Sequence, residues 1–441
     1  MIRNMLPKSL LAVSICTVLS APAIANQATS AFEFHGYFRA GAFASSENDF
    51  NQAIFFGQKE TLGRLGLEGD DFYELAFMQR WDWKDSGDSI RINARLGQDN
   101  PKGGASAMGG YSIDGIPTGL LESFVEFDGI TSSGTFWGGQ RYYGRDNYIF
   151  MTDFFYTDYS GTGLGVQNLK AGGGEWDFAY IASNQNSQGA IGSPSEPGKP
   201  DGCDTDDDVE CSVGNNGMLH AFHVRADYDA WRAEVMLKHL PTNTHGDDYS
   251  TSGVEAHVSY SPGSFFGLGD GFSTTSVQLG QGLGSGTMLG RTFTNYNIYS
   301  PGGANDAYNM TRVKDGDVTV RAQAYGGLFV GDWLFFPAVG YEYTSYDDQL
   351  NGNDDTDYWY AMVRPVYTMP SIDNFSLASE FGVTDQKHND GDAQYKATIA
   401  PTWSMPTGFG PAPEIRLMAS YVSDANGDDD VIVGAQVDMW W

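Results

Sequence analysis

Residues 431–441 read Val431-Ile-Val-Gly-Ala-Gln-Val-Asp-Met-Trp-Trp441 and alternate between two kinds of side chain. The odd positions are apolar, and the even positions are mainly polar or small. Neighbouring residues of a β-strand point to opposite faces, so this stretch predicts a strand with one apolar and one polar face. Such a strand suits either a soluble sandwich, whose apolar face meets a core, or a membrane barrel, whose apolar face meets lipid.

The same alternation recurs in segments 33–40, 318–325 and 414–421, where Arg39, Arg321 and Arg416 stand on the polar face. A charge buried in a dry core costs several kcal/mol unless it is paired. A water-filled lumen removes that cost. The interior arginines therefore favour an all-β transmembrane barrel over a sandwich.

The N-terminus carries the features of a secretory signal. Arg3 and Lys8 precede the apolar run Leu10–Leu19, which is followed by Ala23-Ile24-Ala25, an A-x-A cleavage pattern. We expect residues 1–25 to be a signal peptide and residues 26–441 to be one transmembrane β-barrel domain. The remainder contains no apolar stretch of the 18 or more residues expected for a transmembrane helix.

Strand and loop spacing set the size of the barrel. At ~10 residues per strand, the chain supplies 16 to 18 strands with long loops on one side. Tryptophans near segment ends fit interfacial girdles, namely Trp81, Trp83, Trp333 and Trp359. Gly-, Pro- and Asp-rich inserts indicate the long loops, near 99–119, 185–217, 284–317, 347–357 and 423–430.

Charge, cysteine content and missing motifs exclude several classes of function. The net charge of −31 argues against binding nucleic acid, which is itself a polyanion. The aspartate runs lack the spacing of an EF-hand, which favours solvated loops, although calcium binding there stays open.

Cys16 lies in the signal segment, so Cys203 and Cys211 are expected to form a loop disulfide in an oxidising compartment. No G-x-S-x-G or H-E-x-x-H motif is present, and we expect no catalytic residues, metal or cofactor.

Both ends of the mature chain resemble the maltoporin family. The opening segment Phe34–Gly41 looks like that family's first strand, and Gly434–Trp441 looks like its last. Further similar stretches lie between them, at 64–68, 140–145, 153–158, 160–161 and 363–367. The resemblance implies an 18-stranded barrel that forms a homotrimer, each pore being narrowed by an inward-folded third loop. It also implies diffusion of maltose and maltodextrins along a slide of aromatic residues beside a polar track.

The family's functional residues are carried over position by position. The aromatic slide corresponds to Tyr37, Phe72, Phe272, Phe409 and Trp440, and the polar track to Arg39, Arg64, Glu74, Arg145 and Asp153. Phe155 replaces the tyrosine of the constriction and so lacks its hydroxyl. Period-2 spacing independently places Tyr37, Phe72 and Trp440 on the faces that carry Arg39, Glu74 and Asp438.

The chain departs from the family pattern at several positions. Leu121 stands where an arginine is expected, and segment 99–119 shows no match to the tryptophan lent to a neighbouring subunit. Phe409 is only an approximate match to a slide tryptophan. The exact sugar is therefore left open.

The sequence predicts a porin of the Gram-negative outer membrane rather than an enzyme. Its expected partners are maltooligosaccharides, outer-membrane lipid and two further copies of the chain. Two alternatives stay open: a porin for another saccharide or for small solutes in general, and a surface adhesion or phage-attachment protein.

Overall fold

The structure is a computed structural model, and its described residues are 28–53, 59–69, 71–100, 111–113, 116–184, 218–241, 251–292, 299–300, 311–312, 315–347, 355–386, 393–405, 412–423 and 429–441. Among these residues no helix is long and apolar enough to cross a membrane. The Cys203–Cys211 disulfide and the slide position Phe409 lie outside them and stay predictions.

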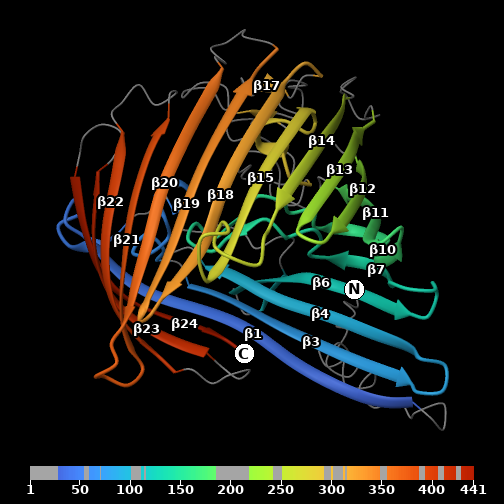
Figure 1. Cartoon of the computed structure of the whole chain (residues 1–441), viewed down its shortest axis with the longest axis horizontal. Helices are drawn as coiled ribbons and strands as arrows, with labels where there is room; N and C mark the ends of the chain where they lie inside the picture. Colours follow the sequence, from blue (N-terminus) through green and yellow to red (C-terminus); the bar gives the residue numbers. More distant parts are fainter. Residues whose placement is uncertain are drawn as a thin grey trace, which may run out of the picture.

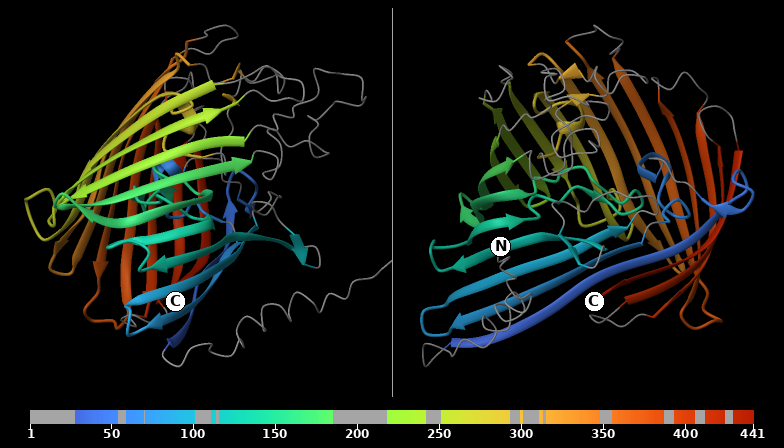
Figure 2. Two further views of the ribbon diagram at one scale, coloured as in Figure 1. Left: turned by 90° about the vertical axis from the view of Figure 1, so that its right-hand side faces the viewer. Right: turned by 180° about the vertical axis from the view of Figure 1, so that it is seen from behind.

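Eighteen of the described strands form one closed antiparallel barrel, as predicted (Figures 1 and 2). Each strand pairs with the next along the chain, and the last pairs with the first. The barrel strands are β1 (Ala28–Ser45), β3 (Asp71–Trp83), β4 (Asp88–Asn100), β6 (Ile116–Asp128), β7 (Thr135–Arg141), β10 (Gly161–Ala171), β11 (Gly174–Asn184), β12 (Met218–Tyr228), β13 (Trp231–Leu240), β14 (Thr251–Tyr260), β15 (Gly271–Gly282), β18 (Val318–Val330), β19 (Trp333–Ser345), β20 (Thr356–Thr368), β21 (Phe375–Gln386), β22 (Gln394–Ser404), β23 (Ala412–Ser423) and β24 (Asp429–Trp440).

Short elements accompany the barrel. They are β2 (Asn51–Gln52), α2 (Lys59–Leu62), β5 (Tyr111–Ile113), β8 (Tyr148–Ile149), β9 (Phe154–Phe155), η3 (Gly286–Met288), β16 (Tyr299–Ser300) and β17 (Thr311–Arg312). The hairpin β8–β9 and the segments with α2 and η3 belong to connections between barrel strands. Their place inside the barrel decides the shape of the channel.

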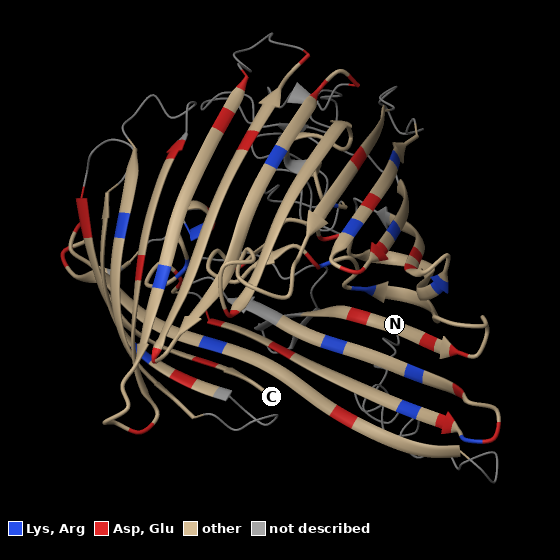
Figure 3. Ribbon diagram, in the orientation of Figure 1, with Lys and Arg blue, Asp and Glu red and all other residues tan. Residues whose placement is uncertain are grey.

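Strand register gives each face of the barrel its character. Arg39 on β1 lies opposite Asp438 on β24, whereas its neighbour Ala40 lies opposite Val437. Directly opposed residues share a face, so polar residues line the lumen and apolar residues face lipid. Charged residues of both signs recur on most strands (Figure 3). The alternation predicted from residues 431–441 is thus confirmed.

The two ends of the barrel differ. At one end the strands are joined by short turns such as 172–173, 229–230 and 331–332, and β24 ends there. At the other end the connections are longer, such as 142–160 between β7 and β10. Outer-membrane barrels place short turns in the periplasm and long loops outside. Trp333 and Trp359 are 43% and 40% exposed on the lipid side, consistent with the predicted girdles.

Within the described residues, three connections fold into the lumen and pack against one another. They are segments 59–69, 142–160 and 283–292. The backbone N–H of Arg64 donates to the Met151 carbonyl at 2.6 Å, and that of Asp158 donates to Gly290 at 2.7 Å. The inward third loop was predicted, but the other two segments were not.

The lumen is not uniformly wet, contrary to the sequence-based expectation. Glu380 is fully buried, and its carboxylate contacts Lys396 at 2.5 Å and Arg364 at 2.6 Å. Lys396 also donates to the carbonyls of Gly63 and Leu65, at 2.5 and 2.9 Å. Segment 59–69 covers this row of charges, and pairing rather than hydration compensates them.

Gly36 offers a test of barrel closure. Its N–H and carbonyl exchange hydrogen bonds of 3.1 Å with Trp441, and a Cβ at this glycine would collide with the Trp441 ring. Gly36→Ala should therefore displace the ring and lower the unfolding free energy by about 2 kcal/mol. Urea unfolding in liposomes, followed by tryptophan fluorescence, measures the change. Gly263→Ala is the control, because open space surrounds that turn glycine; equal stability of the two variants would contradict the prediction.

Candidate functional site

Three of the predicted slide residues meet on the lumen face. Tyr37 on β1 lies opposite Trp440 on β24, and Arg39, two residues on, lies opposite Phe72 on β3. The rings of Tyr37 and Phe72 are 5.7 Å apart at 53°. Trp440 is 48% exposed, so much of its ring is open to the lumen.

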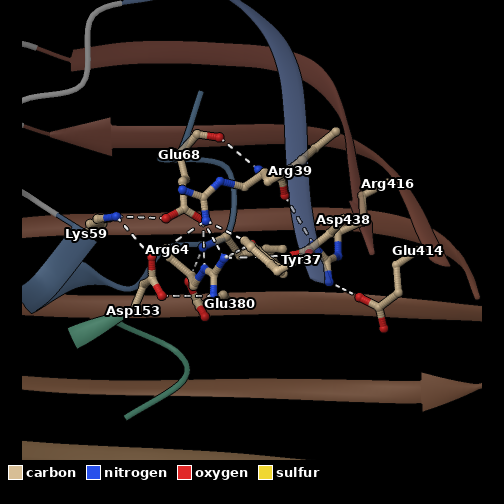
Figure 4. A network of polar contacts seen from close by, with 12 residues as sticks. Tyr37, Arg39, Lys59, Arg64, Glu68, Asp153, Glu380, Glu414, Arg416 and Asp438 are labelled. Atoms are coloured by element: carbon tan, nitrogen blue, oxygen red, sulfur yellow. Dashed lines mark hydrogen bonds and ion pairs between the residues drawn. The ribbon is translucent and has the colours of Figure 1, made fainter. Parts of the chain in front are cut away.

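Beside these aromatics lies a network of charges centred on Glu68 (Figure 4). The Glu68 carboxylate contacts Arg64 and Lys59 at 2.7 Å each and Arg39 at 3.1 Å. Asp153, from segment 142–160, contacts Lys59 at 3.3 Å and Arg64 at 3.5 Å. The network joins two inward segments to the barrel wall, and it brings together the predicted residues Arg39, Arg64 and Asp153.

Electrostatics hold Glu68 ionised. Burial alone would raise the pKa of its carboxyl, but Arg64, Arg39 and Lys59 outweigh that effect and hold the pKa well below its ordinary value. Burial would likewise lower the pKa of Lys59, but Glu68 and Asp153 raise it. Glu68 and Lys59 are therefore both charged at neutral pH.

The other two predicted track residues form a separate group. Glu74 contacts Arg95 at 2.7 Å and accepts a hydrogen bond of 3.1 Å from Tyr142. Arg145 lies 3.9 Å from the centre of the Tyr142 ring and 3.0 Å from Asp158. Glu74 and Arg145 are thus connected through Tyr142.

Phe155 stacks on Tyr148 in the hairpin β8–β9, with the ring centres 4.4 Å apart. The Tyr148 hydroxyl donates to Asp153 at 3.0 Å. Burial raises the pKa of Tyr148, so its hydroxyl stays protonated. The hydroxyl that Phe155 lacks is present on its stacking partner.

A cavity of about 450 Å³ lies next to these residues. Tyr37 and Trp440 line it from the wall, and Arg64 and Tyr148 line it from the inward segments. Arg416 adds a guanidinium that pairs with Glu414 and lies 3.3 Å from Asp438. The volume is within the usual range of ligand pockets.

Sequence reasoning missed several residues of the site. Lys59 and Glu68 are central to the charge network, and Arg95 contacts Glu122 at 2.6 Å, beside the leucine Leu121 that replaces an expected arginine. The family-like stretch 64–68 was the signal that could have led to Glu68, which contacts Arg64 four residues before it. Phe272 was predicted but lies away from the Tyr37 group, on β15, with its ring 6.5 Å from Phe336.

Comparison with known proteins shows the family of the chain. A model of the LamB porin family matches residues 32–441. The chain belongs to that family. A maltoporin of Vibrio cholerae is 26% identical, covering 97% of this chain and 99% of the relative. A maltoporin of Photobacterium profundum is also 26% identical, with 98% of each chain covered, and maltoporin 1 of Aeromonas salmonicida is 25% identical, with 98% and 99% covered.

Family membership and the closed barrel place this porin in the Gram-negative outer membrane. A porin is a channel, and its lumen residues shape a passage instead of carrying out a covalent step.

Removing the central carboxylate should loosen the inward segments. Glu68→Gln removes the buried carboxylate that Arg39, Arg64 and Lys59 share and leaves them only the more distant Asp153 in common. We expect about 3 kcal/mol of destabilisation and larger, noisier single-channel currents. Unfolding in liposomes and bilayer recordings measure the two effects. Glu47→Gln removes an exposed carboxylate and serves as the control; wild-type currents and stability in the Glu68 variant would refute the role.

The contribution of Glu68 should depend on pH. Its folded pKa lies below the ordinary value of 4.5, so its stabilisation is complete above that pH and is lost as the pH falls toward the folded pKa. The difference in unfolding free energy between wild type and Glu68→Gln should therefore shrink below about pH 4.5. Unfolding curves recorded from pH 7 to pH 3 test this; a constant difference would show that Glu68 is not the titrating group.

Proposed function

We propose that the chain carries maltose and maltodextrins across the outer membrane by passive diffusion. The observation that carries the proposal is the group Tyr37, Phe72 and Trp440, which lies on the lumen face beside paired charges. The maltoporins of other bacteria, similar over almost their whole length, support it.

Sugar chemistry explains why this combination suits the substrate. A pyranose ring has apolar C–H faces and a rim of hydroxyls, so aromatic rings cover its faces while charged groups exchange hydrogen bonds with its edge. Tyr37 and Trp440 supply the rings, and Arg64, Arg416 and Asp438 supply charged partners around the same cavity. Because those charges are already paired within the protein, they bind hydroxyls weakly, as a channel requires.

The constriction works by shape in this proposal. The stacked pair Tyr148 and Phe155 projects from the inward hairpin, and Arg145 lies 4.3 Å from the centre of the Phe155 ring. A sugar passing this point meets a flat apolar surface next to a cation. We also propose, from the family resemblance, that three copies of the chain assemble into a homotrimer, which native mass spectrometry in detergent tests.

Block of ion current measures sugar binding directly. Wild-type channels in planar bilayers should be blocked by maltohexaose in a saturable manner, and Trp440→Ala should weaken the block about fivefold, since one aromatic contact is lost. Trp333→Ala is the matched control, because Trp333 is similarly exposed but faces lipid. Large conductance without block by any of a panel of oligosaccharides would overturn the saccharide assignment.

Two alternatives give different results in related experiments. A general-diffusion porin would show unchanged sugar flux in Trp440→Ala. A surface adhesion or phage-attachment protein would depend on its external loops, so deleting residues 185–217 would abolish attachment and leave sugar flux intact.

A further inference from the structure

The connection 261–270 presents apolar side chains at the end of the barrel that carries the short turns. It joins β14 to β15, which are neighbours in the wall (Figure 1). Leu268 is 83% exposed, more than any other large apolar side chain that the structure describes, and Phe266 is 38% exposed. Neither residue belongs to the candidate site.

Hydrogen bonds hold this turn in a defined conformation. The N–H of Phe265 donates to the Gly269 carbonyl at 3.0 Å, and the N–H of Leu268 donates to the Phe265 carbonyl at 2.8 Å. Phe266 has a φ of 48°, in the left-handed region that bulky residues rarely adopt. Such a conformation persists only where the surrounding contacts enforce it. The turn therefore displays Phe266 and Leu268 in a fixed arrangement.

The turn folds back over the outer face of β15. Ser273 lies four residues before Val277, which is 43% exposed on the lipid side, so both point to that side. Ser273 is nevertheless only 1% exposed. Its hydroxyl donates to the Ser264 carbonyl at 2.9 Å and accepts a hydrogen bond of 2.9 Å from the N–H of Phe266. The turn thus covers part of the lipid side of the barrel.

On one side the turn is continuous with the apolar outer surface of β18 and β19. Gly269 lies against Leu328, because a Cβ on the glycine would stand 3.0 Å from the Leu328 side chain. Leu328 is directly opposite Phe335 and so shares its face. Phe335 in turn stacks on the lipid-facing ring of Trp333, with the ring centres 5.7 Å apart.

On the other side the turn adjoins a pair of aromatic rings. Tyr260 directly precedes the turn, and its ring centre is 4.7 Å from that of Trp231 on β13. The two residues are 39% and 56% exposed. Tyrosine and tryptophan at the ends of lipid-facing strands mark the depth of the lipid headgroups. The turn therefore stands at the boundary between membrane and water.

The composition of the turn suits lipid. Residues 261–269 carry no charge, whereas the connection 84–87 at the same end contains Lys84 and Asp85. Burying a charge among acyl chains is costly, so an uncharged tip can enter the membrane where a charged turn cannot. A stable protein interface buries about 800 Å² on each partner, far more than one leucine and one phenylalanine provide. Two apolar side chains suffice to hold a segment at the boundary between headgroups and acyl chains.

We propose that the turn 261–270 is a membrane anchor, which inserts Phe266 and Leu268 into the phospholipid of the periplasmic leaflet. The anchor adds a contact that the strands cannot make, because their lipid-facing side chains end at the rim. It fixes the depth at which β14 and β15 sit in the membrane. The proposal is independent of the solute that passes through the channel.

A nitroxide spin label at position 268 tests the anchor. The full-length porin carries Leu268→Cys with Cys203→Ser and Cys211→Ser, and it is folded into phosphatidylcholine vesicles. Oxygen, which concentrates in the bilayer, and a water-soluble nickel complex each relax the label. We expect oxygen to dominate at position 268. The matched control is Ser86→Cys, an exposed residue of the charged turn 84–87, where the nickel complex should dominate.

Two results of this experiment would overturn the anchor. If the nickel complex relaxes the label at position 268 as strongly as the label at position 86, the turn lies in water. If neither reagent reaches the label at position 268, another protein chain covers the turn, and lipid is the wrong partner.

A second measurement needs no label. Leu268→Ser should raise the equilibrium constant for urea unfolding in liposomes about tenfold, because a leucine held among acyl chains is lost. The side chain is mostly exposed, so contacts within the chain predict a much smaller effect. Phe50→Ser is the control, since Phe50 is 63% exposed in a turn at the opposite end. An unchanged unfolding constant in Leu268→Ser would contradict the proposal.

Discussion

Closure of β1 on β24 is the constraint on which the rest of the structure depends. Lipid offers no partner for backbone N–H and C=O groups, so an open sheet edge within the membrane would leave several groups unsatisfied at several kcal/mol each. Pairing from Tyr37–Trp440 to Ser45–Ile432 removes that edge. It also brings the first and last barrel strands together, so the aromatic pair Tyr37 and Trp440 is a direct product of closure. A residue from the start of the chain and one from its end meet because the barrel must be sealed there.

Closure determines which side chains face the lumen and which face lipid. It does not determine how the charges in the lumen are compensated. Arg39, Arg364 and Arg416 point inward because their neighbours point to lipid. Some interior charges stay partly exposed, such as Arg95, but the inward segments bury others. Where they do, carboxylates such as Glu68 and Glu380 collect two or three cations each. The buried ion pairs are then a consequence of narrowing the channel. Removing one partner would leave a charge with neither water nor a counterion.

The sequence predicted the inner and outer faces correctly where side chains follow the two-residue repeat of a β-strand. The two-residue repeat placed Tyr37, Phe72 and Trp440 on the inner face, and register confirms that placement. It could not find Lys59 or Glu68, since residues 59–69 form no barrel strand and carry no repeat. Phe329 and Phe336 do follow the repeat, but an aromatic residue near a strand end reads equally well as part of an interfacial girdle. The register of β18 with β19 and the cavity beside them are needed to show that an aromatic side chain here faces the lumen and not lipid.

The inward segments convert a wide barrel into a selective passage, because they supply what strands alone cannot. An 18-stranded wall leaves an open aqueous channel, and its side chains are too far apart to hold a sugar from more than one side. Segment 142–160 brings Tyr148 and Phe150 into the lumen, where Phe150 packs against the ring of Phe336 on the wall. The segment is held by Asp153, which contacts Arg64 and Lys59 of segment 59–69. It is also held by Asp158, whose N–H donates to the Gly290 carbonyl in segment 283–292. Selectivity thus depends on contacts between loops as much as on the barrel, and a change in any of the three segments alters the width and lining of the channel together.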